Sequence, residues 1–203
     1  MANILLIYGH PQTPKSFNFD LKEKLVKAIK DNGHNILVRD LYEISFNPLL
    51  SSKDLEMIHN FEIPEDIKQE QEFIKNADTI IFIYPIWWAG QPAIIKGYID
   101  RVFSYGFAYI YKGNKVIGLL SDKKAIILNS TGTPSELYEK SGFHKSMRQV
   151  IDEGIFKFCG FKKVTHIFFG AVPMLTEEQK QLTINNAIDD TIIEIESRLL
   201  LIS

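Results

Sequence analysis

Five short apolar runs alternate with longer segments of helical periodicity along this chain. Near-continuous apolar runs bounded by polar residues predict strands that are buried on both faces, as in parallel sheets. The segments between them repeat apolar residues at helical spacing and predict the helices that connect the strands. The predicted strands are 3–8, 35–40, 79–84, 124–130 and 163–169, and the predicted helices are 17–32, 64–76, 92–103, 143–158 and 176–200.

Five strand–helix units in series predict an α/β fold, with one parallel sheet between two layers of helices. Five strands favour the flavodoxin-like order 2-1-3-4-5. A length of 203 residues suits a single domain, 1–203, and no repeat or linker marks a second one. Two long connections interrupt the pattern. Segment 42–60 contains a short helix start at 51–55, and segment 104–122 is predicted as an aromatic-rich loop.

Charge and cysteine content limit the classes of partner. A net charge of −2 gives no electrostatic reason to expect nucleic acid or membrane partners. The only cysteine, Cys159, excludes a disulfide within the chain, fits a reducing compartment and lies in an apolar context typical of a buried small side chain. The sequence starts without a basic signal-like region and has no apolar run of membrane-spanning length, so we expect a cytoplasmic protein without membrane insertion.

A proline-bounded pair of tryptophans follows the third strand. The residues are Pro85-Ile86-Trp87-Trp88-Ala89-Gly90-Gln91-Pro92. The carboxyl ends of strands are where open α/β sheets bind ligands, and prolines stiffen the loop. A stiff aromatic loop in that place suits a flat, largely apolar ligand. The alternative is that one tryptophan belongs to the core and the other anchors the surface.

The loop after the first strand has features of an anion site. It runs from Gly9 through His10 to Ser16, a good helix N-cap, and then into Phe17 and Asn18. A helix N-terminus offers free N–H groups and the positive end of the helix dipole to a phosphate. The loop lacks the glycine patterns of dinucleotide folds and P-loops, so neither of those sites is indicated. A plain N-cap after a long loop is the alternative.

The fourth strand ends in Asn129-Ser130-Thr131-Gly132-Thr133, and Tyr138 and His144 follow. Gly132 permits a ligand to approach the backbone closely, and free N–H groups in this loop suit a developing negative charge. Tyr138 and His144 are two proton donors of different acidity, which suits a proton relay. Alternatively, Tyr138 packs on the surface and His144 is merely an early residue of a helix. No metal site is predicted.

At these residues the chain resembles a known family, the DT-diaphorase type of NAD(P)H:quinone oxidoreductase. The resemblance spans 1–169 and consists of blocks in the same order and at closely similar spacing, each weak alone and specific together. The blocks are His10 with Ser16-Phe17-Asn18, Asp40-Leu41-Tyr42, Phe46-Asn47-Pro48, the stretch from Pro85 to Phe103, Phe107-Ala108-Tyr109-Ile110-Tyr111, Ser130-Thr131-Gly132, Tyr138, His144 and Phe158-Cys159-Gly160-Phe161.

The resemblance implies a role for each matching residue. Flavin phosphate and ribityl would be held by His10, Ser16, Phe17 and Asn18, and the isoalloxazine ring would be lined by Pro85, Ile86, Trp87 and Trp88. Thr131, Gly132 and Thr133 would face the pyrimidine edge, beside the relay pair Tyr138 and His144. Tyr109, Tyr111 and Phe158 would reach the quinone pocket across a dimer interface, where Trp88 and His144 also lie, and Asp100 would sit at that interface near the cofactor tail.

The resemblance therefore implies a homodimeric flavoenzyme that transfers a hydride from NAD(P)H to quinone-like acceptors by a ping-pong mechanism. Ala89 stands where the family has a bulky aromatic, Thr133 replaces a glycine and Trp87 a glutamine, so substrate preference stays open. The insertion after the second strand favours FAD, with FMN as the alternative. The other functional class is a flavodoxin-like electron carrier or the regulatory subunit of a membrane transporter, and the modest net charge argues against the carrier.

Overall fold

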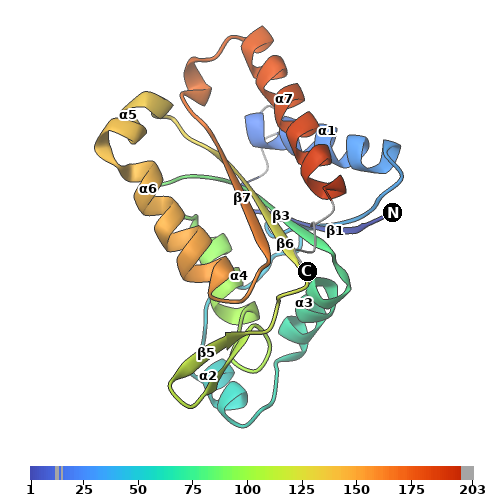
Figure 1. Cartoon of the computed structure of the whole chain (residues 1–203), viewed down its shortest axis with the longest axis vertical. Coiled ribbons are helices and arrows are strands. Elements are labelled where there is room, and N and C mark those ends of the chain that lie inside the picture. Colours follow the sequence, from blue (N-terminus) through green and yellow to red (C-terminus); the bar gives the residue numbers. More distant parts are fainter. Residues whose placement is uncertain (12–13, 15, 198–203) are drawn as a thin grey trace, which may run out of the picture.

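A computed structural model describes residues 1–11, 14 and 16–197 of the chain. Five parallel strands form one sheet in the order β2-β1-β3-β6-β7. When only the strands of this sheet are numbered, that order is 2-1-3-4-5, so the predicted flavodoxin-like topology is confirmed (Figure 1). The strands are β1 (Asn3–Tyr8), β2 (Asn35–Asp40), β3 (Thr79–Pro85), β6 (Lys124–Ser130) and β7 (Lys163–Phe169).

Helices cover both faces of the sheet, and every residue of β3 and β6 is therefore buried. Apolar side chains of β1, β3 and β6 alternate between two cores, as the two-residue period of a strand requires. One core is closed by α1 (Phe17–Asp31) and α7 (Glu177–Glu196). The other is closed by α3 (Glu65–Asn76), α4 (Ala93–Val102), α6 (Phe143–Arg148) and the π-helical segment Gln149–Lys157 that continues α6.

Three elements differ from the sequence prediction. The predicted loop 104–122 contains an antiparallel hairpin of β4 (Tyr109–Lys112) and β5 (Lys115–Gly118), and its turn begins at Gly113 with φ of 61°. A short helix, α5 (Ser135–Ser141), stands between β6 and α6, and it went unpredicted because Pro134 and Gly142 leave room for only two turns. The predicted continuous helix 143–158 changes to π-helical geometry after α6.

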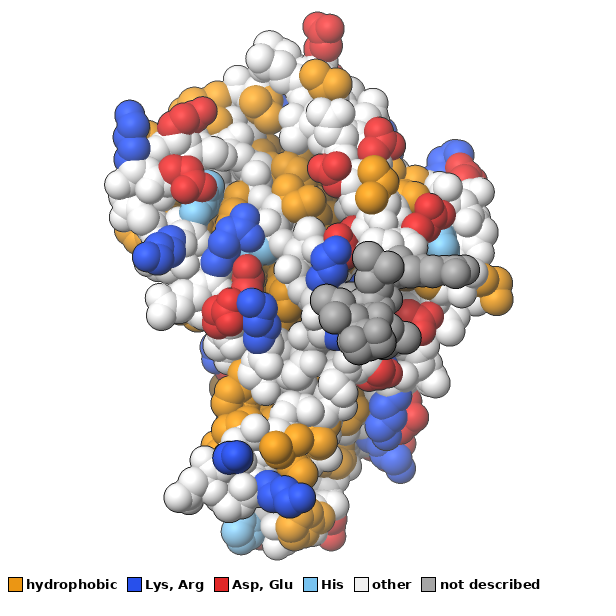
Figure 2. Space-filling view, in the orientation of Figure 1, with side chains coloured by type: hydrophobic (Ala, Val, Ile, Leu, Met, Phe, Trp, Pro, Cys, Tyr) orange, Lys and Arg blue, Asp and Glu red, His pale blue; other side chains and the backbone are white. Residues whose placement is uncertain are grey.

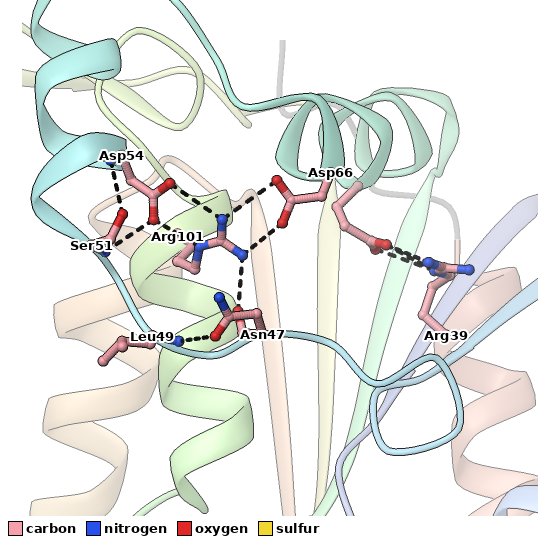
Figure 3. A network of polar contacts seen from close by, with 8 residues as sticks. Arg39, Asn47, Leu49, Ser51, Asp54, Asp66 and Arg101 are labelled. Atoms are coloured by element: carbon pink, nitrogen blue, oxygen red, sulfur yellow. Dashed lines mark hydrogen bonds and ion pairs between the residues drawn. The ribbon is translucent and has the colours of Figure 1, made fainter.

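The segment after β2 is fastened to α4 by a buried arginine. Arg101 donates to Asn47 O at 2.9 Å and pairs with Asp54 on α2 (Ser52–His59) and Asp66 on α3, at 3.1 and 2.7 Å (Figure 3). Ser51 and Asp54 form a capping box, which confirms the short helix expected here. Burial alone would raise the pKa of Asp54, but the Ser51 N–H and the Arg101 guanidinium outweigh it and hold that pKa below its ordinary value.

Two adjacent lysines at the amino end of β6 cap helices in both layers. Lys123 Nζ donates to Lys75 O and Ala77 O, both at 2.9 Å, at the end of α3. Lys124 Nζ donates to Glu194 O at 2.9 Å and Ser197 O at 2.6 Å, at the end of α7. Both lysines are buried, and their ammonium groups supply donors to carbonyls that a helix end leaves unpaired.

The last helix packs through a stripe of apolar residues, which the sequence repeats at helical spacing at Ile184, Ile188, Ile192, Ile195 and Leu199. Ile184 and Ile195 are buried, and Ile188 and Ile192 pack against the same core. Leu199, the last member of the stripe, lies outside the described residues, as does the predicted helical stretch beyond 197. The assignment of 1–203 to one domain stays a prediction.

Candidate active site

Three of the predicted loops meet at the carboxyl edge of the sheet. The loop after β3 is joined to the end of β6 by Ile86 N–H, which donates to Ser130 O at 2.8 Å. The loop after β1 reaches the same loop, because the His10 ring lies 6.3 Å from a Trp87 ring. The structure therefore places residues of β1, β3 and β6 around one edge, which is where open α/β sheets bind ligands.

The two tryptophans belong to a tight turn that projects from this edge. Trp87 and Gly90 exchange backbone hydrogen bonds at 3.1 and 3.0 Å, and the central residues Trp88 and Ala89 have φ of 52° and 57°. Positive φ at both central positions is the conformation of a type I′ turn, which glycine and asparagine usually occupy. The Trp88 side chain is fully exposed and Trp87 is 44% exposed, so neither belongs to the core. The turn thus presents an indole to solvent at a strained backbone position.

The first loop ends in a well-formed helix cap. Ser16 Oγ accepts from Phe19 N–H at 3.2 Å, which confirms Ser16 as the N-cap of α1. Phe17 packs against the ring of Phe169 at 5.3 Å and fixes the first turn of the helix to the core. Asn18 is buried, and its Oδ1 has no hydrogen-bond partner within the described residues. Gln12, Thr13 and Lys15 of this loop lie outside those residues.

Hydrogen bonds of Thr131 hold the loop after β6 in its conformation. Thr131 N–H donates to Phe169 O at 2.8 Å, and Thr131 Oγ1 donates to Thr133 O at 2.7 Å. A Cβ added to Gly132 would meet no atom within 4 Å, so the backbone is open on that side. In the described part of the chain, the N–H groups of Gly132 and Thr133 donate no hydrogen bond. Two backbone N–H groups of this loop are therefore left without a partner among the described residues.

The predicted relay residues are brought together by the turn between α5 and α6. Gly142 adopts φ of 77° and ends α5, so α6 starts at a new angle and the Tyr138 and His144 rings meet edge-on at 5.5 Å. His144 is buried, and its Nδ1 lies 2.7 Å from Glu139 Oε1. Its Nε2 is buried without a partner among the described residues. One ring nitrogen is thus oriented by a carboxylate, and the other remains available.

Sequence reasoning missed the residues that support this pair. Glu139 escaped notice because an exposed acid next to a tyrosine is ordinary on a short helix. His166, Asp152 and Asn129 form a buried polar chain behind the site, with heavy-atom distances of 2.6 Å from each His166 nitrogen to its neighbour. A histidine inside an otherwise apolar predicted strand was the signal that could have pointed to it.

The comparisons with known proteins agree with this geometry. The family model described as "Flavodoxin-like fold" matches residues 2–191. The chain belongs to this flavodoxin-like family. An uncharacterized NAD(P)H oxidoreductase of Haemophilus influenzae is 38% identical over 93% of this chain and 94% of its own length.

Two further similar proteins have a quinone in their names. Ribosyldihydronicotinamide dehydrogenase [quinone] of Rattus norvegicus is 34% identical over 88% of this chain and 86% of its own. The solved structure of NAD(P)H:quinone oxidoreductase from Methanothermobacter marburgensis has a TM-score of 0.83 and 32% identity, and covers 93% of this chain and 96% of its own. The resemblance to quinone reductases that the sequence indicated is confirmed.

The aromatic residues expected in the substrate pocket of this flavodoxin-like protein lie elsewhere in the chain. Tyr109, Tyr111 and Phe158 form a cluster, in which the Tyr109 ring lies 5.8 Å from the Tyr111 ring and 5.0 Å from the Phe158 ring. They belong to the hairpin end of the molecule, and α5 with Tyr138 lies at the opposite end (Figure 1). Within one copy these residues therefore lie away from Tyr138 and its neighbour His144. Figure 2 shows apolar side chains at the surface of the hairpin end, where Tyr111 is 57% exposed.

A pocket of about 190 Å³ lies between the tryptophan turn and α6 with its π-helical continuation. Its lining is mainly apolar and includes Ala89, Gly90, Phe143, Met147 and Val150. A larger hollow of about 330 Å³ lies among residues of β1, β2 and α3 near the amino ends of the strands, away from the edge where such sheets bind ligands. The smaller pocket is therefore the one beside the candidate chemistry.

Three further observations concern metal ligands, membrane spans and the cysteine. Across residues 1–11, 14 and 16–197, no group of three or more His, Cys, Asp or Glu side chains is placed to hold a metal ion. None of the helices in the same residues has the length and apolar character that crossing a bilayer requires. Cys159 is buried, which confirms the expected buried side chain, and burial raises the pKa of its thiol to about 12.

Proposed function

We propose that this chain is a flavin-dependent NAD(P)H:quinone oxidoreductase that works as a homodimer. The observation that carries the proposal is the meeting of three elements at one sheet edge. They are an exposed indole on a stiff turn, two backbone N–H groups at Gly132 and Thr133 without a partner among the described residues, and the contact between half-buried Tyr138 and buried His144. An enzyme of the oxidoreductase class follows from the family to which the chain belongs.

The residues at this edge fit a flavin. A flavin combines a flat aromatic ring, a polar pyrimidine edge and a phosphate-bearing tail. Trp88 presents a flat apolar surface, and the Gly132 and Thr133 N–H groups present donors to a polar edge. The N-terminus of α1, with the buried acceptor Asn18 Oδ1, supports binding of the phosphate and ribityl tail, together with His10 and Ser16.

When bound, a flavin would supply the hydride and two-electron chemistry that connects NAD(P)H with a quinone. The chain would supply binding and charge stabilisation. The N–H groups of Gly132 and Thr133 would stabilise negative charge on the pyrimidine edge, because fixed dipoles in a partly closed site need no reorganisation. Tyr138 Oη would hold a proton for the same edge, and His144 Nε2, oriented through Nδ1 by Glu139, would restore that proton.

The second copy completes the substrate pocket in this proposal. Tyr109, Tyr111 and Phe158 cannot reach Trp88 within one chain, yet they form an exposed aromatic cluster. A two-fold dimer would bring the hairpin of one copy to the sheet edge of the other. The nucleotide and the quinone would then use the same face in turn, which gives ping-pong kinetics.

We favour FAD over FMN as the flavin. Segment 42–60 is held rigidly against α4 by the Arg101 network and so offers a fixed wall for the longer cofactor. The family resemblance would place the cofactor tail near Asp100, which is exposed on the same helix.

The decisive experiment is a spectrum of the purified protein, with the extracted cofactor identified by mass. We expect the flavin absorption bands, an FAD mass and quinone-dependent oxidation of NAD(P)H. No flavin binding at micromolar concentration would refute the proposal. Flavin binding without NAD(P)H oxidation would instead point to an electron carrier or a regulatory subunit.

The dimer is tested separately by light scattering and by Tyr111→Ala. We expect twice the mass of the 23.3 kDa chain. Tyr111→Ala should lower quinone turnover and leave flavin binding intact, and Leu182→Ala, at an exposed position of α7, serves as the control. A monomer at working concentration would contradict the shared pocket.

A further inference from the structure

A buried polar chain runs directly behind the candidate site and has no part in the chemistry described so far. Its centre is His166 of β7, whose side chain is completely buried. His166 Nδ1 lies 2.6 Å from Asp152 Oδ1 of the π-helical segment, and Nε2 lies 2.6 Å from Asn129 Oδ1 of β6. Asn129 Nδ2 in turn donates to Tyr84 O of β3 at 3.1 Å. The chain therefore joins the π-helical segment to three neighbouring strands.

The hydrogen-bond chemistry fixes where the protons lie. Because Asn129 Nδ2 faces a carbonyl oxygen, its Oδ1 must face the imidazole and accept a hydrogen bond from Nε2–H. The contact between Nδ1 and Asp152 Oδ1 then needs a proton of its own. That proton lies in the hydrogen bond between the two atoms. Burial lowers the pKa of the His166 imidazolium, and the hydrogen bond and charge of Asp152 oppose this shift.

The same histidine is connected to the relay through one phenyl ring. The Phe168 ring lies 4.1 Å from the His166 ring and 4.3 Å from the His144 ring. Two rings this near to a third must lie on its opposite faces, so Phe168 is held between the two imidazoles. Arg148 completes the surroundings: its guanidinium lies over Phe168 at 5.1 Å and 3.6 Å from Asp152 Oδ2. The remaining charged neighbour, Glu139, contacts His144.

The buried polar residues contact two parts of the candidate site. Asn129 holds the Tyr84 carbonyl, immediately before the Pro85 that opens the tryptophan loop, and itself lies two residues before Thr131. Phe168 backs the relay histidine. Asp152 lies in π-helical geometry, which is uncommon and frequently accompanies function.

We propose that the Asp152–His166–Asn129 chain is a positioning network that sets the place of His144 and of the loops after β3 and β6. Its role in the reaction rests on the proposed function. The network holds these parts through hydrogen bonds and ring packing, and it touches neither cofactor nor substrate. A one-ångström displacement of a catalytic group is costly, so a loosened network lowers the rate of flavin reduction without abolishing flavin binding.

The first test detects the hydrogen bond between His166 and Asp152 directly and needs no cofactor. Proton NMR of the wild-type chain should show a far-downfield imidazole N–H signal from the proton between His166 Nδ1 and Asp152 Oδ1. Asp152→Asn, which keeps the side-chain shape, and His166→Gln should both lose that signal. Its absence from the wild type would overturn the network.

The second test reads the role of the network in the flavin-loaded protein. Asp152→Asn and His166→Gln should retain flavin, reduce it about 10- to 100-fold more slowly in stopped flow, and show a larger solvent deuterium isotope effect. Lys124→Met, which breaks buried polar contacts at the other end of β6, controls for lost stability and should keep the wild-type rate.

Wild-type rates and isotope effects in both variants would overturn the positioning role. A wild-type chain that binds no flavin would refute the proposed function, and with it the role in the reaction, while the N–H signal would still decide whether the network exists.

Discussion

Replacing Gly97 with alanine should destabilise the chain, although alanine is the better helix former. A Cβ at Gly97 in α4 would collide with the carbonyl oxygen of Pro48 and lie 2.6 Å from its carbonyl carbon. Those atoms are backbone and ring atoms of the segment after β2, so the segment must move away. The movement also breaks the contact in which Arg101 donates to Asn47 O at 2.9 Å (Figure 3).

The magnitude follows from three competing effects. Alanine gains about 1 kcal/mol of helix propensity over glycine. Overpacking costs about 1–3 kcal/mol, and a lost hydrogen bond to a charged group costs about 1.5–3 kcal/mol. The net loss in the free energy of unfolding is about 2–5 kcal/mol, which corresponds to a melting temperature about 5–15 °C lower for a chain of this size.

Gly154→Ala is the matched control for this substitution. Gly154 is also helical and exposed, and a Cβ there would meet only Gln149 O, at an ordinary 3.5 Å. Calorimetry of both variants should show Gly154→Ala at or above the wild-type melting temperature and Gly97→Ala well below it. Equal melting temperatures for the two variants would refute the close-packing argument.

Four further outcomes are expected. Tyr138→Phe and His144→Gln should each slow flavin reduction about 10- to 100-fold in stopped flow, and the double variant should be little slower than the slower single one. Ala89→Gly should raise the free energy of unfolding by about 0.5–1 kcal/mol in urea titrations, since glycine relieves the left-handed backbone. The lowered pKa of Asp54 contributes stability that is complete above about pH 4 and is lost as the pH falls further; Asp54→Asn should therefore flatten the acid limb of stability measured against pH. Cys159 should resist alkylation at pH 8 in the native chain and react only after unfolding, as mass spectrometry can show.

The sequence predicted the sheet well because its strands are buried on both faces. The bounds of β1, β2, β6 and β7 match the prediction, and β3 is longer by Pro85 alone. The hairpin of β4 and β5 was missed, although Gly113-Asn114 between apolar runs is a turn signal. Local sequence is therefore sufficient to predict the strands of the central sheet, because an apolar run indicates a buried strand. The hairpin strands are largely exposed and lack that signal.

Only some residues of the candidate site could be predicted from the sequence. Residues that stand directly after strands, such as Trp88 and Gly132, are identifiable because the topology brings strand ends together. His166 and Asp152 are 14 residues apart on different elements, and only packing shows that they meet. Likewise, the exposure of Trp88 depends on a turn whose positive φ values no local rule assigns to a tryptophan.

The two lysines at the start of β6 link the two faces of the molecule in a way that affects how it opens. Neighbouring positions at a strand's end point to opposite sides, so a single dipeptide holds the last turn of α3 in one layer and of α7 in the other. If either helix end detaches, it leaves a buried ammonium without acceptors, which is costly. The two helix ends should therefore exchange their amide hydrogens as one unit, although they belong to different cores and lie more than 110 residues apart along the chain.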